Sequence, residues 1–254
     1  MFALSQLKKT YQQLRLLAGA TLIIAPLLIV SLAYRERPEL MPTLSHYYFF
    51  EEQSAQIRTL FTGFLILLGG LMLAYRGFSD ADNWIHNVAG IAAIVVAFCP
   101  KLCDEADLHY AHPESALSVF HAPAAGLMFV LAAAAVIYSG GRAFLERLDA
   151  SERTRLRIAE VCSLLLMLAG IAIYLLFLYL GREMDVPDYG VLLVEYAGFV
   201  GFSAHWLAMT YVIRSANRRR AGRRAAPGSA RDDLPASVEA RESLPTSASA
   251  EIIP

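Results

Sequence analysis

One short connection gathers several kinds of side chain that could do chemistry. The stretch CPKLCDEADLHYAHPESALSVFH, residues 99–121, holds two cysteines, three histidines and four carboxylates. Imidazole and carboxylate groups are ligands for zinc, iron or copper. His109 and His112 form an HxxH pair, and together with His121 they predict a divalent metal site. No complete CxxC…CxxC or HExxH pattern is present, so a solvated polar loop is the alternative interpretation.

Three further ionisable residues are expected at the same depth in a membrane. Glu195 and His121 each lie a few residues inside an apolar run, and Arg58 opens another such run just after His46 in LSHYYFFEE. An ionisable group inside a membrane is costly and usually faces the bundle interior. The sequence therefore predicts Glu195 and His121 as catalytic residues, with His46 as a further metal ligand. An Arg58–Glu195 ion pair that only holds helices together is the structural alternative.

Six apolar runs must position these residues. Of the 254 residues, 56% are hydrophobic and 18% are charged, whereas soluble domains carry about 25% charge. Apolar runs of about 18 residues or more are typical of membrane spans, and lipid offers the backbone no partner outside a helix. The sequence predicts an all-α, polytopic membrane bundle of six transmembrane helices, over residues 16–34, 59–75, 84–99, 116–138, 161–180 and 190–213.

Basic residues predict the orientation of this bundle. With six spans, 17 of the 22 Lys and Arg residues fall in the N-terminus, the second and fourth loops and the tail. The positive-inside rule then predicts that both termini are cytoplasmic and that residues 100–115 face outward. The expected location is a bacterial inner membrane, whose outer side is the oxidising periplasm. The sequence is compatible with a disulfide between Cys99 and Cys103 on that side, and equally with two free thiols.

The chain divides into three predicted regions. Residues 1–15 form a cytoplasmic N-terminus, residues 16–213 the six-helix membrane domain, and residues 214–254 a cytoplasmic tail. The tail is basic at first and then rich in Ser, Ala, Pro and Glu, which is a composition typical of disorder. An arginine cluster beside a span favours contact with anionic lipid over nucleic acid. The predicted partners are therefore the bilayer and anionic lipid.

The predicted cytoplasmic connection YRGFSDADNWIHN, residues 75–87, has the residues of a turn followed by a helix start. Gly77 allows a tight turn, and Asp80 and Asp82 are predicted to cap the third span. His205, ten residues beyond Glu195 on the last span, points off the Glu195 face. It is therefore not expected in the same site.

Several segments together resemble a family of six-helix bacterial membrane proteins known as a domain of unknown function. They are LSHYY, the following Arg58, FTGFLILLGGLMLAYRGFSDADN, NVAGIAAIVVAFCP and FHAPAAGLMFVLAAAA. The resemblance covers roughly residues 40–140 and implies fold and membrane location rather than an activity. The family pattern implies Phe, Pro and Thr at the end of the third span, where this chain has FCPKLC.

A remoter likeness is to the superfamily of alkaline ceramidases and adiponectin receptors, which hold zinc with three histidines beside a serine and an aspartate. Their pattern pairs SxxxH with a late HxxxH. Here Ser118 and His121 form SxxH, and the sixth span offers His205 alone, so the pattern is not met.

Three functions stay open on the sequence. The first is an inner-membrane protein of unassigned activity with an outward-facing polar site. The second is a metal-dependent membrane hydrolase acting on a lipid or lipid-linked substrate, in which zinc or another divalent metal activates water. The third is a small transporter, disfavoured because no inverted repeat is visible. The sequence leaves open whether the protein is an enzyme.

Overall fold

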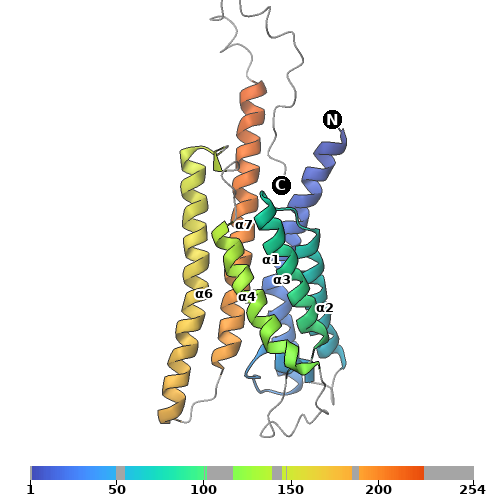
Figure 1. The fold of residues 1–254 in the computed structure, drawn as a ribbon, viewed down its shortest axis with the longest axis vertical. Helices are drawn as coiled ribbons and strands as arrows, with labels where there is room; N and C mark the ends of the chain where they lie inside the picture. Colours follow the sequence, from blue (N-terminus) through green and yellow to red (C-terminus); the bar gives the residue numbers. More distant parts are fainter. Residues whose placement is uncertain are drawn as a thin grey trace, which may run out of the picture.

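In the computed structural model, the chain forms a bundle of long helices (Figure 1). The structure describes residues 2–49, 55–99, 101, 117–138, 145–146, 148–184 and 189–225. Within these ranges there is no strand. The helices are α1 (Phe2–Glu36), η1 (Leu44–Phe49), α2 (Ala55–Ala74), α3 (Asp80–Phe98), η3 (Ser118–Phe120), α4 (His121–Tyr138), α6 (Ala150–Met184) and α7 (Gly190–Ala225).

Six of these helices are long and apolar enough to cross a membrane. The prediction of an all-α bundle with six membrane-spanning helices is therefore confirmed. The short third span is one of the six, because α3 has 19 residues and a helix of that length reaches about 28 Å, close to the thickness of a bilayer's hydrocarbon core.

Neighbouring helices follow one another around the bundle in the order α6, α7, α1, α2, α3 and α4. Figure 1 shows α6 beside α7, away from α2 and α3. Because consecutive spans run in opposite directions, the connections gather at two ends. We call the end with the start of α1, the α2–α3 connection and the end of α7 the tail end. The opposite end, with η1 and the start of α4, is the loop end.

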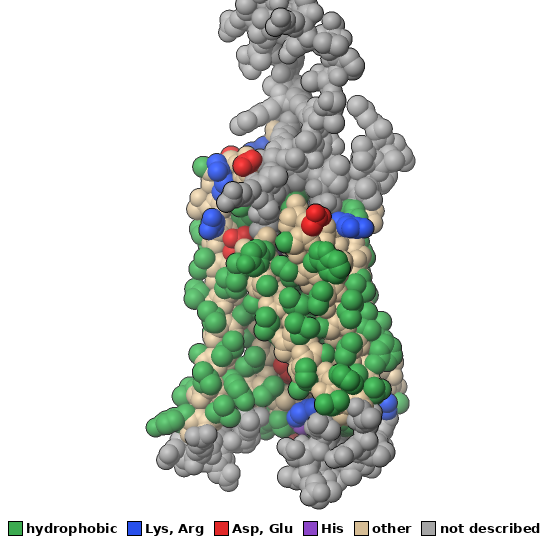
Figure 2. All heavy atoms as spheres, viewed as in Figure 1, with side chains coloured by type: hydrophobic (Ala, Val, Ile, Leu, Met, Phe, Trp, Pro, Cys, Tyr) green, Lys and Arg blue, Asp and Glu red, His purple; other side chains and the backbone are tan. Residues whose placement is uncertain are grey.

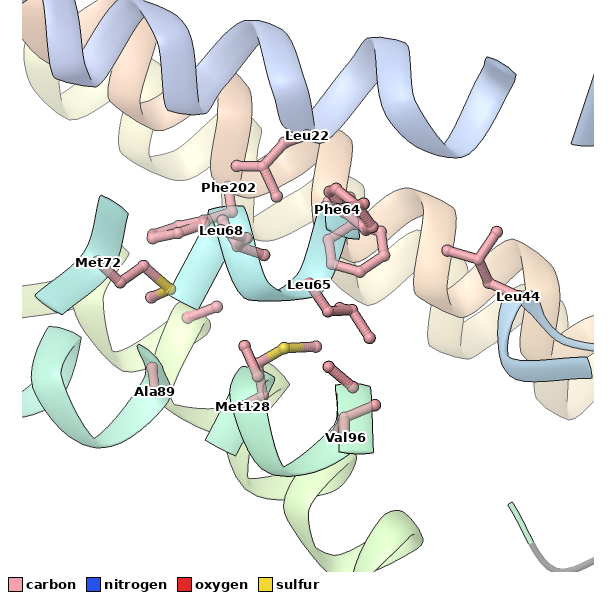
Figure 3. Packing of buried hydrophobic residues seen from close by; sticks show 14 of the residues in the cluster. Leu22, Leu44, Phe64, Leu65, Leu68, Met72, Ala89, Val96, Met128 and Phe202 are labelled. Carbon is pink, nitrogen blue, oxygen red and sulfur yellow. The ribbon is translucent and has the colours of Figure 1, made fainter. Parts of the chain in front are cut away.

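Apolar side chains from α1, α2, α3, α4 and α7 fill the centre (Figure 3). Small residues let backbones approach where helices cross, which is the usual way that membrane helices pack. Gly19 of α1 accepts a hydrogen bond from Ser203 Oγ of α7 at 2.6 Å. Gly170 of α6 is so close to Ala197 of α7 that a Cβ on it would lie 2.6 Å from the alanine Cβ.

The outer surface has the polarity of a membrane protein. Hydrophobic side chains cover the middle of the face shown in Figure 2, and Lys, Arg, Asp and Glu gather near its two ends. The share of buried residues is smallest in α6, at 17% of its span. Its outward side chains, which include Leu165, Leu175 and Tyr179, are apolar and exposed. Lipid is as apolar as these side chains, so a membrane accommodates them without a protein partner.

Four helices extend beyond their predicted spans at the tail end, where α1, α3 and α6 begin earlier than predicted and α7 ends later. α6 begins at Ala150, where Asp149 accepts from the Glu152 amide at 2.8 Å and Glu152 accepts from the Asp149 amide at 3.1 Å. This reciprocal cap starts the helix well before the apolar run. α7 continues to Ala225, so residues 214–225 are helical and the predicted disordered tail is corrected there. Ala and Arg favour helix, and basic side chains suit a helix C-terminus.

Candidate functional site

The loop-end site is built around η1, whose position is fixed by contacts with α7. Leu44 N donates to Glu195 Oε2 at 2.6 Å, and Leu192 N donates to the Pro42 carbonyl at 3.0 Å. Within the segment, Met41 N donates to the Tyr47 hydroxyl at 3.2 Å. These bonds satisfy backbone groups that would otherwise be buried without partners. They hold the short helix against the start of α7.

Ser45 of η1 and His121 of α4 meet in the buried interior of this end. His121 Nε2 lies 2.9 Å from Ser45 Oγ, and His121 Nδ1 lies 2.5 Å from the Cys99 carbonyl oxygen. A carbonyl oxygen only accepts, so Nδ1 carries the proton and donates it. In the neutral imidazole Nε2 then accepts from the serine hydroxyl. Two hydrogen bonds thus connect the serine hydroxyl, the histidine ring and the backbone carbonyl that fixes the tautomer of the histidine.

His46, the next residue, has partners of its own. His46 Nδ1 lies 2.8 Å from Thr43 Oγ1, and Lys101 Nζ lies 3.2 Å from His46 Nε2. An ammonium group only donates, so Nε2 accepts and Nδ1 donates to the threonine. Lys101 also interacts electrostatically with His121 and with Glu195. It brings a positive charge close to the Ser45–His121 pair.

The structure gives Arg58 and Glu195, predicted as a pair, different partners. Glu195 accepts from the Leu44 amide. Arg58 donates to the Tyr48 hydroxyl at 2.9 Å, and its guanidinium carbon lies 4.4 Å from the centre of the Tyr48 ring. Among the described residues, Glu195 is therefore hydrogen bonded to η1 and not to Ser45 or His121.

The predicted metal ligands are not gathered into a site in the part of the chain that the structure describes. Both ring nitrogens of His46 and of His121 have protein partners. No group of three or more His, Cys, Asp or Glu residues that could hold a metal occurs within the described ranges. His109, His112 and Cys103 lie outside those ranges. Cys99 is a buried free thiol.

Sequence reasoning missed a second polar group, at the tail end. Ser79 is the N-cap of α3, because its hydroxyl accepts from the Asp82 amide at 3.1 Å, so the prediction that Asp80 and Asp82 cap this helix is corrected. Asp82 instead accepts from the Phe78 amide at 3.1 Å. Asp82 is also fully buried beside His86. His205 and Arg15 are buried near them. The signal available in the sequence was the depth of His86 and His205 in their spans.

Comparisons with protein-family models, with curated proteins and with solved structures found no match to this chain.

Proposed function

We propose that this membrane protein is an ester hydrolase with Ser45 as nucleophile and His121 as general base. The observation that carries the proposal is the Ser45 Oγ–His121 Nε2 contact of 2.9 Å, with His121 Nδ1 bound to the Cys99 carbonyl. A nucleophile within hydrogen-bond reach of a base, with the base oriented by a third group, is the arrangement that activates a serine. In serine hydrolases the third group is more often a carboxylate; here a backbone carbonyl supplies the orientation.

The chemistry follows from these contacts. Ser45 Oγ attacks the ester carbonyl carbon while its proton passes to His121 Nε2. The C–O bond to the alcohol then breaks, and His121 returns the proton to the departing alcohol oxygen, which leaves an acyl group on Ser45. Water attacks the acyl carbon, gives a proton to His121, and releases the acid as Ser45 recovers its proton. Lys101 is the nearby cation that favours the negative oxygen formed in both additions.

The depth of the site supports a lipid or lipid-linked ester as substrate. The candidate span that contains α4 begins at Ser118, so His121 lies about 6 Å further along the axis, at about 2.0 Å per residue in the 3-10 turn η3. Ester groups of membrane lipids lie at this boundary between headgroup and hydrocarbon. Ser45 and His121 are each 5% exposed, which favours a substrate arriving through lipid over one arriving from bulk water.

The metal-dependent alternative fits these residues less well. Zinc hydrolases need about three protein ligands with unprotonated nitrogens or carboxylate oxygens facing one point. His121 Nδ1 carries a proton directed at a carbonyl, and His46 Nδ1 is bound to Thr43. The described histidines of the loop end therefore do not fit a zinc centre.

A fluorophosphonate probe tests the proposal, because an activated serine displaces fluoride and keeps the phosphonyl group. We expect the wild-type protein in detergent to be labelled at Ser45, as located by peptide mass spectrometry. Ser45→Ala and His121→Ala should lose the label. Ser118→Ala, which removes another buried serine at the loop end, should keep it. Unlabelled Ser45 in folded protein would refute the assignment.

We also propose a bacterial inner-membrane location, with both termini in the cytoplasm, contact between the arginine cluster and anionic lipid, and membership of the six-helix family of unknown function. The support is the skew of basic residues and the LSHYY segment, which carries Ser45.

In a variant with every native cysteine replaced by serine, an impermeant thiol reagent on intact cells should label Arg37→Cys at the loop end. It should not label Ser151→Cys at the tail end. The reverse pattern would invert the topology.

A further inference from the structure

A compact polar group lies inside the tail end of the bundle, at the opposite end from Ser45. We call it the tail-end cluster and define it as five residues that are each at most 4% exposed. Four different helices or their ends contribute them, which are α1, the end of α2, α3 and α7. The members are Arg15, Tyr75, Asp82, His86 and His205.

Aromatic rings enclose this cluster. The Arg15 guanidinium carbon lies 5.1 Å from the centre of the Tyr75 ring and 5.4 Å from that of Phe78. The His86 ring lies 4.4 Å from the Tyr75 ring and stacks on Trp206 at 5.6 Å. Such walls keep bulk water out and strengthen every electrostatic interaction inside them.

The Asp82 carboxylate supplies the negative charge in the cluster, and it faces its own turn and His86. Asp82 Oδ2 accepts from the Phe78 amide at 3.1 Å, and Asp82 Oδ1 lies 3.0 Å from His86 Nδ1. The same His86 nitrogen lies 2.8 Å from the Asp82 carbonyl oxygen. Asp82 therefore faces its own turn and His86, although Oδ1 itself accepts no hydrogen bond.

Arg15 is the uncompensated charge. Among the described residues no carboxylate lies within ion-pair distance of its guanidinium, which is hydrogen bonded to Tyr75 and otherwise faces rings. Its Nε and Nη2 atoms are buried and have no hydrogen-bond partner. Leaving a buried charged donor unpaired is expensive. These two atoms form one edge of the guanidinium, and that edge is a two-pronged donor that matches the oxygens of a carboxylate or phosphate.

Two imidazole nitrogens add to the unpaired set. His86 Nε2 and His205 Nδ1 are buried without partners. His205 interacts electrostatically with Arg15, with His86 and with Asp82, so these side chains lie close enough to one another to form a single polar group. His86 Nδ1 donates to the Asp82 carbonyl, so Nε2 of the neutral ring is an acceptor, and an oxyanion is the ligand that offers acceptors to the Arg15 edge and to a protonated His205 Nδ1 together.

We propose that the tail-end cluster is a binding site for a small oxyanion, a phosphate or carboxylate group held on the Nε–Nη2 edge of Arg15 with His205 Nδ1 as a further donor. The connection from Tyr75 to Ser79 covers it, and Phe78 is the ring of that connection that lies over the guanidinium. The group has two sources, a free anion or the headgroup of an anionic lipid, and the two give different results below.

The test uses the full chain in detergent and measures its thermal unfolding with sodium phosphate or sodium acetate against sodium chloride at equal ionic strength. At an anion concentration about tenfold above the dissociation constant, a bound anion raises Tm by about 3–6 °C. Arg15→Lys keeps the charge but lacks the two-pronged edge, and it should lose the shift. Arg214→Lys is the matched control, because Arg214 lies at the same end and binds Gln12, and it should keep the shift.

Native mass spectrometry of the same preparations distinguishes the source. A phospholipid that co-purifies with wild type and Arg214→Lys but not with Arg15→Lys, without a shift from free anions, supports the lipid headgroup. A Tm shift that is the same in wild type and Arg15→Lys, or no shift and no bound lipid, overturns the proposal. If Arg15→Lys does not unfold cooperatively, His205→Ala takes its place, with at least half of the shift or of the bound lipid lost.

Discussion

Gly69 of α2 and Gly90 of α3 face each other where the two helices cross. A Cβ on Gly69 would lie 2.6 Å from the Gly90 carbonyl oxygen, and a Cβ on Gly90 would lie 2.8 Å from the Gly69 carbonyl oxygen. Both distances are far below a normal contact, and both involve backbone atoms that cannot turn aside. The close crossing of α2 and α3 therefore depends on the absence of two side chains.

We expect Gly69→Ala to destabilise the bundle by about 1–3 kcal/mol, the usual cost of an extra methyl group in a packed interior. Gly70→Ala is the control, because a Cβ there would meet nothing within 4 Å, and it should leave the stability nearly unchanged. Unfolding of the purified protein in detergent, by heat or by denaturing detergent, measures both. Equal stability of the two variants would contradict the close crossing.

Asp149 and Glu152 join the start of α6 to Arg219 of α7, which donates to both carboxylates. The pKa of Asp149 is lowered from 3.8, first by the hydrogen bond from the Glu152 amide, then by Ser151, and less by the charge of Arg219. A carboxyl with a lowered folded-state pKa stabilises the fold above its unfolded value and loses that contribution as the pH falls through the folded one. Stability from Asp149 should therefore disappear on acidification below about 4.

Asp149→Asn isolates this contribution, since asparagine can still cap the helix but carries no charge. We expect wild type to have the higher Tm near neutral pH and the difference between the two proteins to shrink on acidification toward about pH 3. The measurement is Tm against pH for both proteins in the same detergent. Parallel curves with a constant gap would show that the charge of Asp149 has no part in the α6–α7 contact.

The membrane architecture was predictable because span length and apolar composition are local properties. α3 could be drawn from Trp84 to Cys99 for that reason. The residues at which the helices begin and end were harder to predict. α6 begins at a cap before the apolar run, and α7 continues through basic residues that favour helix. Polarity alone does not mark where a helix ends.

The depth of the site residues in the membrane could be predicted from the sequence, but which side chains contact each other could not. Glu195, His121 and Arg58 were expected near one level because each lies at or near the outer end of a predicted span, and His46 precedes Arg58 in the same connection. That His121 would meet Ser45, 76 residues away, depends on how α3, α4 and η1 pack. Arg15 shows the same limit: it was assigned to a solvated terminus, whereas α1 begins at Phe2 and carries Arg15 into the bundle, where it is 2% exposed. Periodicity carries no information on which helix will cover a residue.

Glu195 is expected to act as a positioning residue for Ser45. Glu195→Ala leaves the buried Leu44 amide without its acceptor, which costs about 1–3 kcal/mol, and loosens η1. Glu195→Gln keeps an acceptor oxygen at nearly the same place. We therefore expect the rate of fluorophosphonate labelling at Ser45 to fall several-fold in the alanine variant and to stay near wild type in the glutamine variant. Equal loss in both variants would mean that the charge of Glu195 itself takes part.

Metal removal separates the two kinds of hydrolase that the sequence left open. If Ser45 and His121 react as proposed, dialysis against a chelator should leave labelling at Ser45 unchanged, because the proton acceptor is an imidazole nitrogen already fixed by the Cys99 carbonyl. In a metal-dependent enzyme the same treatment removes the group that activates water. Elemental mass spectrometry of wild type, His121→Ala and the His109→Ala/His112→Ala double variant provides the second measurement. Near-stoichiometric metal lost in one folded variant, together with labelling that needs metal, would replace the serine mechanism with the metal one. Labelling that survives the chelator and depends on both Ser45 and His121 would leave the serine mechanism as the one supported by experiment.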